Sequence, residues 1–278
     1  MQRREPALPL ITLTTDFGPS QYPGICRAVL YHLAPEAHVL DVTHDVPPYD
    51  VVAGALIARD ALPFFPPGVH MVVVDPGVGS ERRGVALLTG RGDYLVGPDN
   101  GLLLPAAERL GGIAAAHELT NRELMWDPPS DTFQGYSLFA PAAAHLAMGT
   151  PLISFGPAVA PESLVRAPLP APLLATEQAM LEATLVMWDR FGSARLYAPA
   201  AWLEQVLPSY GDEGYLESPD GRRWPLRRAR TFSDVADGAL AVLADSSGDV
   251  LIAVNRGSAH EQLGLDVGIR LRLARSEV

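Results

Sequence analysis

Hydrophobic and polar residues form alternating strand-like and helix-like runs over the first half of the chain. The nearly continuous apolar and β-branched run at 8–15 predicts a strand buried on both faces, and the runs at 37–44 and 69–75 are also strand-like. Helical spacing of apolar residues at 23–34 and 51–62 places a helix between successive strands. Strands that alternate with helices indicate βαβ units, so we expect an α/β domain with a mostly parallel sheet.

The pattern changes after these βαβ units. Residues 85–90 and 93–101 are typical of a hairpin pair, 102–110 predict a short helix, and 136–149 predict a helix with an apolar face. The stretch 156–172 is rich in proline and alanine and is typical of a linker.

Beyond the linker the pattern is dominated by short strands, which indicates a small β-barrel or a sandwich. The predicted strands are 183–192, 214–218, 239–245, 249–254 and 269–273. We therefore expect an α/β domain over 1–160, a linker over 161–174 and a β-barrel domain over 175–278.

Composition excludes several classes of function. The net charge of −11 and the lack of a basic stripe argue against a nucleic-acid partner. All 21 basic residues are arginine, which excludes Schiff-base chemistry on lysine and a Walker A loop. Cys26 is the single cysteine, so the chain has neither an internal disulfide nor a zinc cluster built on cysteine. We see no signal peptide and no apolar run long enough to span a membrane, and we expect a cytoplasmic protein.

Short polar motifs follow the predicted strands of the first domain. They are TTDFG at 14–18, THDVPPYD at 43–50, VDPGVGSER at 74–82 and VGPDNG at 96–101. Ligands bind outside the carboxyl ends of strands in open α/β sheets, so we expect the four motifs to converge on one crevice. Taken alone, Asp75 is either a turn former after a strand or a carboxylate held for chemistry.

The ordered set of motifs resembles the S-adenosylmethionine (SAM) hydroxide adenosyltransferases, the SAM hydrolases that are related to fluorinase and chlorinase. The resemblance rests on the four motifs above together with TFQGYSLFAPAAAHLA, DRFG and AVNRGSA, and it covers nearly the whole chain. It implies a homotrimer with sites at subunit interfaces, in which water attacks C5′ of the ribose and releases adenosine and methionine. It implies no metal and no cofactor besides the substrate.

The resemblance also implies roles for residues of the first domain. Asp16 matches the ribose-binding aspartate, with a turn residue as its alternative reading, and Tyr49 matches an aromatic ring that stacks on the ligand or merely packs. Asp75 and Arg82 match two members of an Asp-Arg-His set around the nucleophilic water. The halogenating relatives place tyrosine where this chain has Asp75, and a carboxylate repels halide.

One segment departs from the family pattern. The expected TFHGRD is TFQGYS here, so Gln134 replaces the third member of the catalytic set, next to the substrate-binding candidate Phe133. Glutamine can orient a water by hydrogen bonding, but it does not accept a proton at neutral pH. The chain is therefore either a SAM hydrolase, with full or reduced activity, or a non-catalytic or altered-substrate protein that binds adenosine or SAM. A halogenase is the weaker alternative.

The second domain is expected to contact the adenine and methionine parts of the ligand. Asp189 matches a contact to the methionine amino group, and Ser193 replaces a family asparagine that contacts adenine. Phe191 either packs against the base or belongs to the core. Ser246, Asn255 and Arg256 fall where the neighbouring subunit closes the pocket in the family, and Arg256 either meets the methionine carboxylate or is a solvated arginine.

Overall fold

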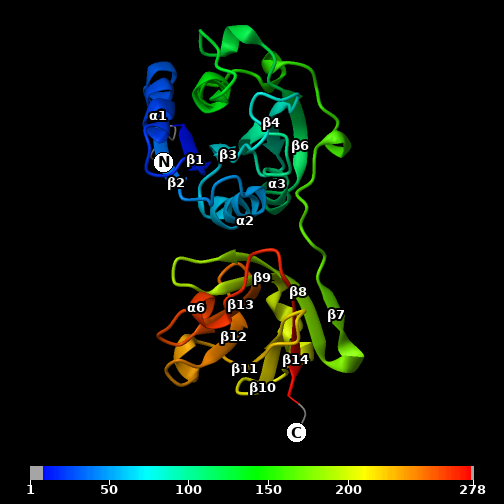
Figure 1. Cartoon of the computed structure of the whole chain (residues 1–278). Coiled ribbons are helices and arrows are strands. Elements are labelled where there is room, and N and C mark those ends of the chain that lie inside the picture. Colours follow the sequence, from blue (N-terminus) through cyan, green and yellow to red (C-terminus); the bar gives the residue numbers. More distant parts are fainter. Residues whose placement is uncertain (1–8, 277–278) are drawn as a thin grey trace, which may run out of the picture. The chain divides into compact units, whose positions relative to one another are not determined.

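The computed structural model describes residues 9–276, and the chain divides into two compact units between Pro168 and Leu169. The first unit is built on a six-stranded sheet with the order β2-β1-β3-β5-β4-β6 (Figure 1). Its strands are β1 Leu10–Thr15, β2 His38–Thr43, β3 Val69–Val73, β4 Gly84–Thr89, β5 Tyr94–Pro98 and β6 Ile113–Glu118.

The sheet is mixed, so the prediction of a mostly parallel sheet is not confirmed. The pairs β1–β2, β1–β3 and β3–β5 are parallel, whereas β4 pairs antiparallel with both β5 and β6. The cause is the predicted hairpin of β4 and β5, because a connection of only a few residues forces antiparallel pairing. The pattern did not predict β6, whose sequence IAAAHE is rich in alanine and poor in strand-forming residues.

Helices pack on both faces of this sheet. The helices are α1 Tyr22–Leu33, α2 Val51–Ala61, α3 Leu104–Arg109 and α4 Ala140–Ala147, and α4 is preceded by a π-helical turn, η3 Gly135–Phe139. Short 3₁₀ turns are η1 Leu62–Phe64, η2 Arg122–Leu124, η4 Leu152–Phe155 and η5 Pro161–Ser163. The core joins α1 and α4 to the alternate residues Ile11, Leu13, Met71 and Val73 of β1 and β3.

The second unit is a barrel that closes where β14 pairs with β8. Its strands are β7 Leu173–Ala175, β8 Met180–Trp188, β9 Ala194–Pro199, β10 Glu213–Glu217, β11 Arg223–Arg228, β12 Leu240–Ala244, β13 Asp249–Val254 and β14 Arg270–Arg275. Its helices and turns are η6 Thr176–Gln178, η7 Ala200–Trp202, α5 Leu203–Val206, η8 Phe232–Asp234 and α6 Ala259–Leu263. The barrel prediction is confirmed, although β7, β9 and β11 were not predicted from the pattern.

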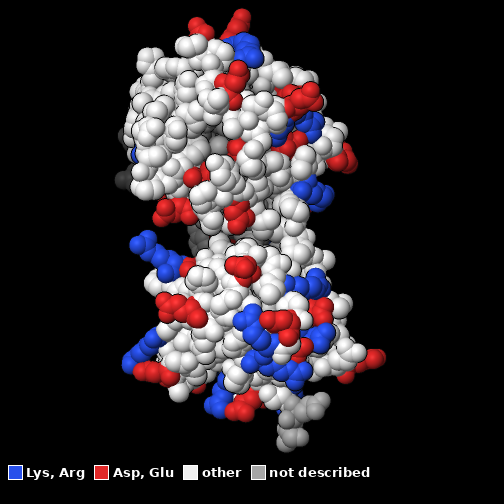
Figure 2. Space-filling model, viewed as in Figure 1, with Lys and Arg blue, Asp and Glu red and all other residues white. Residues whose placement is uncertain are grey.

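Ion pairs join neighbouring strands on the outside of the barrel, next to the β14–β8 pairing that closes it. Arg272 of β14 lies 3.1 Å from Glu182 of β8 and 3.5 Å from Glu217 of β10. Figure 2 shows arginine and acidic side chains interleaved over this unit. The Arg272 side chain is 45% exposed, so both pairs are partly screened by solvent.

Candidate active site

A pocket of about 440 Å³ opens at the carboxyl ends of β1 and β3 in the first unit. It is lined by Asp16, Phe17, Tyr22, Pro48, Tyr49, Val73, Asp75, Val78, Thr132, Phe133, Gln134 and Gly135. We call it the N-terminal pocket. It contains five of the residues singled out in the sequence, and the parallel strands β1 and β3 bring Asp16 and Asp75 to the same edge of the sheet.

Three of the four polar motifs reach the N-terminal pocket, and the fourth does not line it. Asn100 of the motif 96–101 instead donates from Nδ2 to the carbonyl of Val74 at 2.9 Å, directly before Asp75. Asp99 accepts hydrogen bonds from Arg83 and from the N–H of Val165. This motif therefore braces the backbone that follows β3 without lining the pocket. Residues 132–135 line the pocket in its place.

Asp75 and Arg82 form a bidentate ion pair. Arg82 Nη2 lies 2.5 Å from Asp75 Oδ2, and Arg82 Nε lies 3.1 Å from Asp75 Oδ1. The side chains are 7% and 9% exposed. The guanidinium also donates to the carbonyl of Arg83 at 2.9 Å and lies 5.5 Å from the ring centre of Phe139. Its position is thus fixed from several sides before a ligand arrives.

Burial raises the pKa of the Asp75 carboxyl. This effect outweighs the charge and hydrogen bonds of Arg82 and the hydrogen bond from the N–H of Gly77, which lower it. Two bonds from Arg82 and one from Gly77 account for three of the roughly four acceptor positions of a carboxylate. Within residues 9–276, at least one acceptor position therefore remains for a proton donor in the pocket.

Gln134 joins this pair from a segment far away in sequence. Its Oε1 accepts a hydrogen bond of 2.6 Å from Arg82 Nη2. An arginine can only donate, so the amide oxygen must face Arg82 and the amide NH₂ must point elsewhere. This NH₂ group has no partner within residues 9–276, so Gln134 has free hydrogen-bond donors next to the Asp75–Arg82 pair. The first N–H groups of the η3–α4 helix, which follow Gln134, add a partial positive charge there.

Asp16 holds the loop that carries Tyr49. Asp16 Oδ2 accepts the backbone N–H of Tyr49 at 2.9 Å, and Tyr49 has a φ of 66°, which is uncommon for a residue other than glycine. The Tyr49 ring is 72% exposed, so it is not a packed core side chain. Asp16 Oδ1 has no hydrogen-bond partner within the described part of the chain.

Aromatic rings form one wall of the N-terminal pocket. Phe133 lies 5.3 Å from Phe17, 4.6 Å from Tyr22 and 5.3 Å from Tyr136, measured between ring centres. The sequence indicated only Phe133 of this group. Phe17 belongs to the motif TTDFG, but the motif assigned it no role. Tyr22 could not be predicted, because it lies in the first turn of a helix outside every motif.

The six candidates of the second unit line one cavity of about 840 Å³, which we call the barrel cavity, at the surface of the barrel unit and outside its packed core. They are Asp189, Phe191, Ser193, Ser246, Asn255 and Arg256. Asp189 Oδ1 accepts the N–H groups of Phe191 and Ser193, each at 2.8 Å, and so holds its own turn. Phe191 is 81% exposed, and its ring is not part of the barrel core.

The barrel cavity also contains an ion pair that the sequence did not indicate. Arg195 Nη2 lies 2.6 Å from Asp245 Oδ2, and both side chains are largely buried. Arg256 has a φ of 54° and pairs with Asp237 at 3.1 Å. Asn255 donates to the carbonyl of Val235 and to Asp237, so its amide braces the loop as well as lining the cavity.

His44, the histidine of the motif at 43–50, is bonded to residues outside the Asp75–Arg82–Gln134 group. His44 Nδ1 lies 2.7 Å from the hydroxyl of Thr15, and its Nε2 lies 3.1 Å from Asp41. Within residues 9–276, no cluster of three or more His, Cys, Asp or Glu side chains is placed to hold a metal ion. None of the helices in that range is long and apolar enough to cross a membrane.

Comparison with known proteins identifies the family. Residues 11–156 match the SAM hydroxide adenosyltransferase N-terminal domain, and residues 183–272 match the C-terminal domain. The chain is 47% identical over 266 residues to the (R)-S-adenosyl-L-methionine hydrolase of Salinispora tropica, across 95% of this chain and 97% of that protein. It is 25% identical over 290 residues to the fluorinase of Nocardia brasiliensis, across 95% of this chain and 96% of that protein.

A solved structure has the same fold. The crystal structure of an uncharacterized conserved protein from Thermotoga maritima aligns with a TM-score of 0.88 at 34% identity, covering 95% of this chain and 100% of that one. The matches extend over both units and confirm the resemblance seen in the motifs. The chain belongs to the SAM hydroxide adenosyltransferase family.

Proposed function

We propose that the protein hydrolyses S-adenosyl-L-methionine to adenosine and L-methionine. The observation that carries this proposal is the buried Asp75–Arg82–Gln134 group in the pocket that also contains Asp16. The 47% identity to a protein named (R)-S-adenosyl-L-methionine hydrolase supports it.

The reaction is a displacement at C5′ of the ribose. The water oxygen forms the new bond to C5′, and the electron pair of the breaking C5′–S bond goes to sulfur. The sulfonium leaves as a neutral thioether and needs no acid, so the protein has to align the water and remove one proton. Asp75 receives this proton at its remaining acceptor position, and the raised pKa brings its basicity closer to neutral pH.

Arg82 and Gln134 orient the groups around the water. Arg82 holds Asp75 through two hydrogen bonds, and the same guanidinium holds Gln134 through a third. Gln134 thereby presents its NH₂ group as a donor to the water oxygen. A proton-accepting residue at position 134 is not required in this mechanism, because the carboxylate of Asp75 accepts the proton.

Asp75 also favours water over halide. A carboxylate in a site of low polarity repels chloride or fluoride, whereas it accepts a hydrogen bond from water.

Asp16 and the barrel residues serve binding in our proposal. Asp16 Oδ1 receives a ribose hydroxyl while Oδ2 keeps Tyr49 in place. Asp189 receives the methionine amino group, and Phe191 and Ser193 contact the adenine. The proposal includes a homotrimer with sites at subunit interfaces, as the family resemblance implies.

Turnover in H₂¹⁸O tests the function. We expect one ¹⁸O atom in the 5′-hydroxyl of the adenosine, detected by mass spectrometry, and a loss of roughly 10²–10⁴ in kcat for Asp75→Asn, the range expected for a general base. Asp266→Asn, which changes an exposed barrel aspartate, is the control and should match the wild type. A wild type that binds SAM without releasing adenosine contradicts the proposal and identifies a binding protein, and Gln134→His then shows whether the histidine restores turnover.

A further inference from the structure

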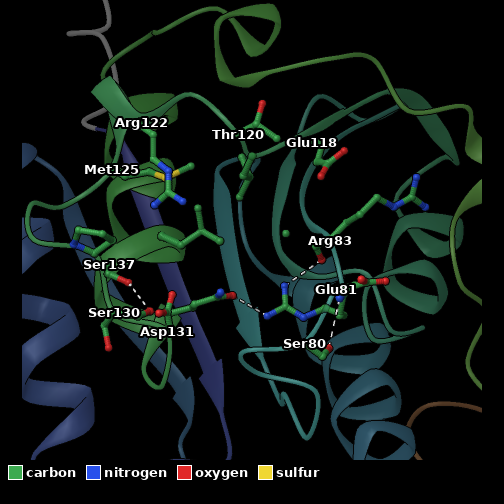
Figure 3. Close-up of a pocket in the computed structure, with 16 residues that line it drawn as sticks. Ser80, Glu81, Arg83, Glu118, Thr120, Arg122, Met125, Ser130, Asp131 and Ser137 are labelled. Carbon is green, nitrogen blue, oxygen red and sulfur yellow. Dashed lines mark hydrogen bonds between the residues drawn. The ribbon is translucent and has the colours of Figure 1, made fainter.

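A second cavity lies behind the Arg82–Gln134 hydrogen bond. It measures about 260 Å³, and we call it the polar chamber. Figure 3 shows Arg83, Glu81 and Glu118 on one side and Ser130, Asp131 and Ser137 on the other. Charged and hydroxyl groups dominate this lining, so the chamber is a place for water; its volume admits on the order of ten molecules at the volume that liquid water occupies.

One residue connects the two cavities. Within residues 9–276, Gln134 is the only residue that lines both the polar chamber and the N-terminal pocket. Arg82 lines the chamber, and its ion-pair partner Asp75 lines the pocket. The Arg82–Gln134 hydrogen bond thus separates bulk-accessible polar space from the carboxylate that receives the proton.

The geometry of the attack bears on where the water comes from. Displacement at C5′ needs the attacking oxygen in line with, and opposite to, the departing sulfur. A bound substrate fills the N-terminal pocket from its mouth, between Asp16, Tyr49 and the aromatic wall. A ligand seated there leaves no room for water to enter by the same mouth, whereas the chamber borders Arg82, the ion-pair partner of Asp75.

Gln134 is suited to control this passage. It is held to the partition by a single hydrogen bond to Arg82, while Arg82 itself has three further contacts to Asp75 and the Arg83 carbonyl. A rotation of the Gln134 side chain breaks one bond and leaves the Asp75–Arg82 pair intact. The residue therefore opens the partition without disturbing the base.

We propose that the polar chamber delivers the nucleophilic water to Asp75 through the Gln134 partition, separately from the substrate entrance. This inference rests on the proposed hydrolase function and adds the route of the second substrate. The water oxygen bonds to C5′, the C5′–S electron pair goes to sulfur, and Asp75 takes the proton.

Filling the chamber tests the route. Thr120 and Arg122 line it from exposed positions, and their side chains make no hydrogen bond or ion pair within residues 9–276. Thr120→Trp and Arg122→Trp should lower kcat at least roughly tenfold and leave KM for SAM within about twofold, because substrate binding is unaffected and only the chemical step loses its nucleophile. Glu123→Trp adds the same side chain to the same η2 turn outside the chamber lining and should leave kcat and KM unchanged.

The outcomes separate the two proposals. A wild type that makes no adenosine contradicts the hydrolase function. An active wild type whose two filled variants keep full kcat, with the tryptophans shown in the chamber by crystallography, overturns the water route alone. A crystal structure of the wild type with adenosine gives an answer that does not depend on turnover: ordered waters should fill the chamber up to Gln134 on the side away from the 5′-hydroxyl, and a chamber without ordered water next to Gln134 contradicts the proposal.

Discussion

Two buried aspartate–arginine pairs lie at opposite ends of the same sheet, and they differ in how completely the carboxylate is satisfied. Asp75 follows the carboxyl end of β3, and Asp93 precedes β5 at the amino ends of β3 and β5. Asp93 is fully buried and accepts hydrogen bonds from Arg91, Thr89, His70 and the N–H of Gly68. Among the described residues, Asp75 accepts only from Arg82 and Gly77.

The pKa values of the two carboxyls move in opposite directions. Burial raises the pKa of both groups, but for Asp93 the hydrogen bonds and charges of His70 and Arg91 more than compensate, so its pKa lies well below the usual range. For Asp75 burial prevails. A saturated carboxylate serves the fold, whereas a carboxylate with a free position and a raised pKa is available for proton transfer.

The largest effect is expected from Asp93→Asn. The substitution removes the counter-charge of Arg91 and a hydrogen-bond partner of buried His70, and breaking such a buried pair typically costs about 3–5 kcal/mol in the free energy of unfolding. Urea unfolding of the variant beside Asp266→Asn measures this. A loss below about 1 kcal/mol, the size of an exposed pair, would show that the Asp93 network is not a structural element.

The second-largest expected effect is that acid abolishes the function of Asp75 at a higher pH than it abolishes the stabilising effect of Asp93. Because Asp75 must be ionised to accept a proton, kcat/KM should rise with pH through its raised pKa and level off above it, with about a tenfold change per pH unit on the limb. Asp93 has a lowered pKa, so its contribution to stability is complete above the ordinary aspartate range and is lost only in stronger acid. Activity should therefore fall before stability does. Coincident loss of both, followed by circular dichroism and adenosine release, would contradict the assignment of Asp75 as the base.

Asp75→Asn should have a smaller effect on stability than Asp93→Asn. A raised pKa means that the folded protein disfavours the ionised form, so a neutral isostere removes less than the usual worth of a buried pair. We expect a change of about 1 kcal/mol in the same unfolding experiment, against 3–5 kcal/mol for a pair that is stabilised in its ionised form. An equal loss in both variants would remove the distinction between the two carboxylates.

We expect the partly exposed ion pairs of the barrel to contribute least to the free energy of unfolding. Arg272→Ala removes contacts to Glu182 and Glu217 from a side chain that is 45% exposed. The expected cost is about 0.2–1 kcal/mol, and it should shrink at high salt. A larger, salt-independent loss would indicate that Arg272 contributes through packing of its aliphatic stem.

Elements that depend on nearby residues in the chain were predicted from the sequence, whereas contacts between distant segments were not. The strands ending at Asp16 and Asp75, the hairpin of β4 and β5 and the strand-rich second unit followed from periodicity and turn residues. The mixed character of the sheet did not follow, because the position of β6 beside β4 depends on chain crossing and not on its alanine-rich sequence. The cluster of Phe17 and Tyr22 on Phe133 and the pair of Arg195 with Asp245 also joined segments whose patterns gave no sign of one another.

The amino-acid sequence by itself determined the family, the elements and the chemical types available at the site, because short-range periodicity and ordered motifs are properties of the chain. Only the tertiary structure decided what those groups do. It turned the oxygen of Gln134 toward Arg82, 52 positions earlier in the chain, and so made the amide a donor. It surrounded the Asp93 carboxylate with hydrogen-bond donors and left at least one acceptor position of the Asp75 carboxylate without a donor among the described residues. The number of donors around a buried carboxylate depends on which strands and turns meet there.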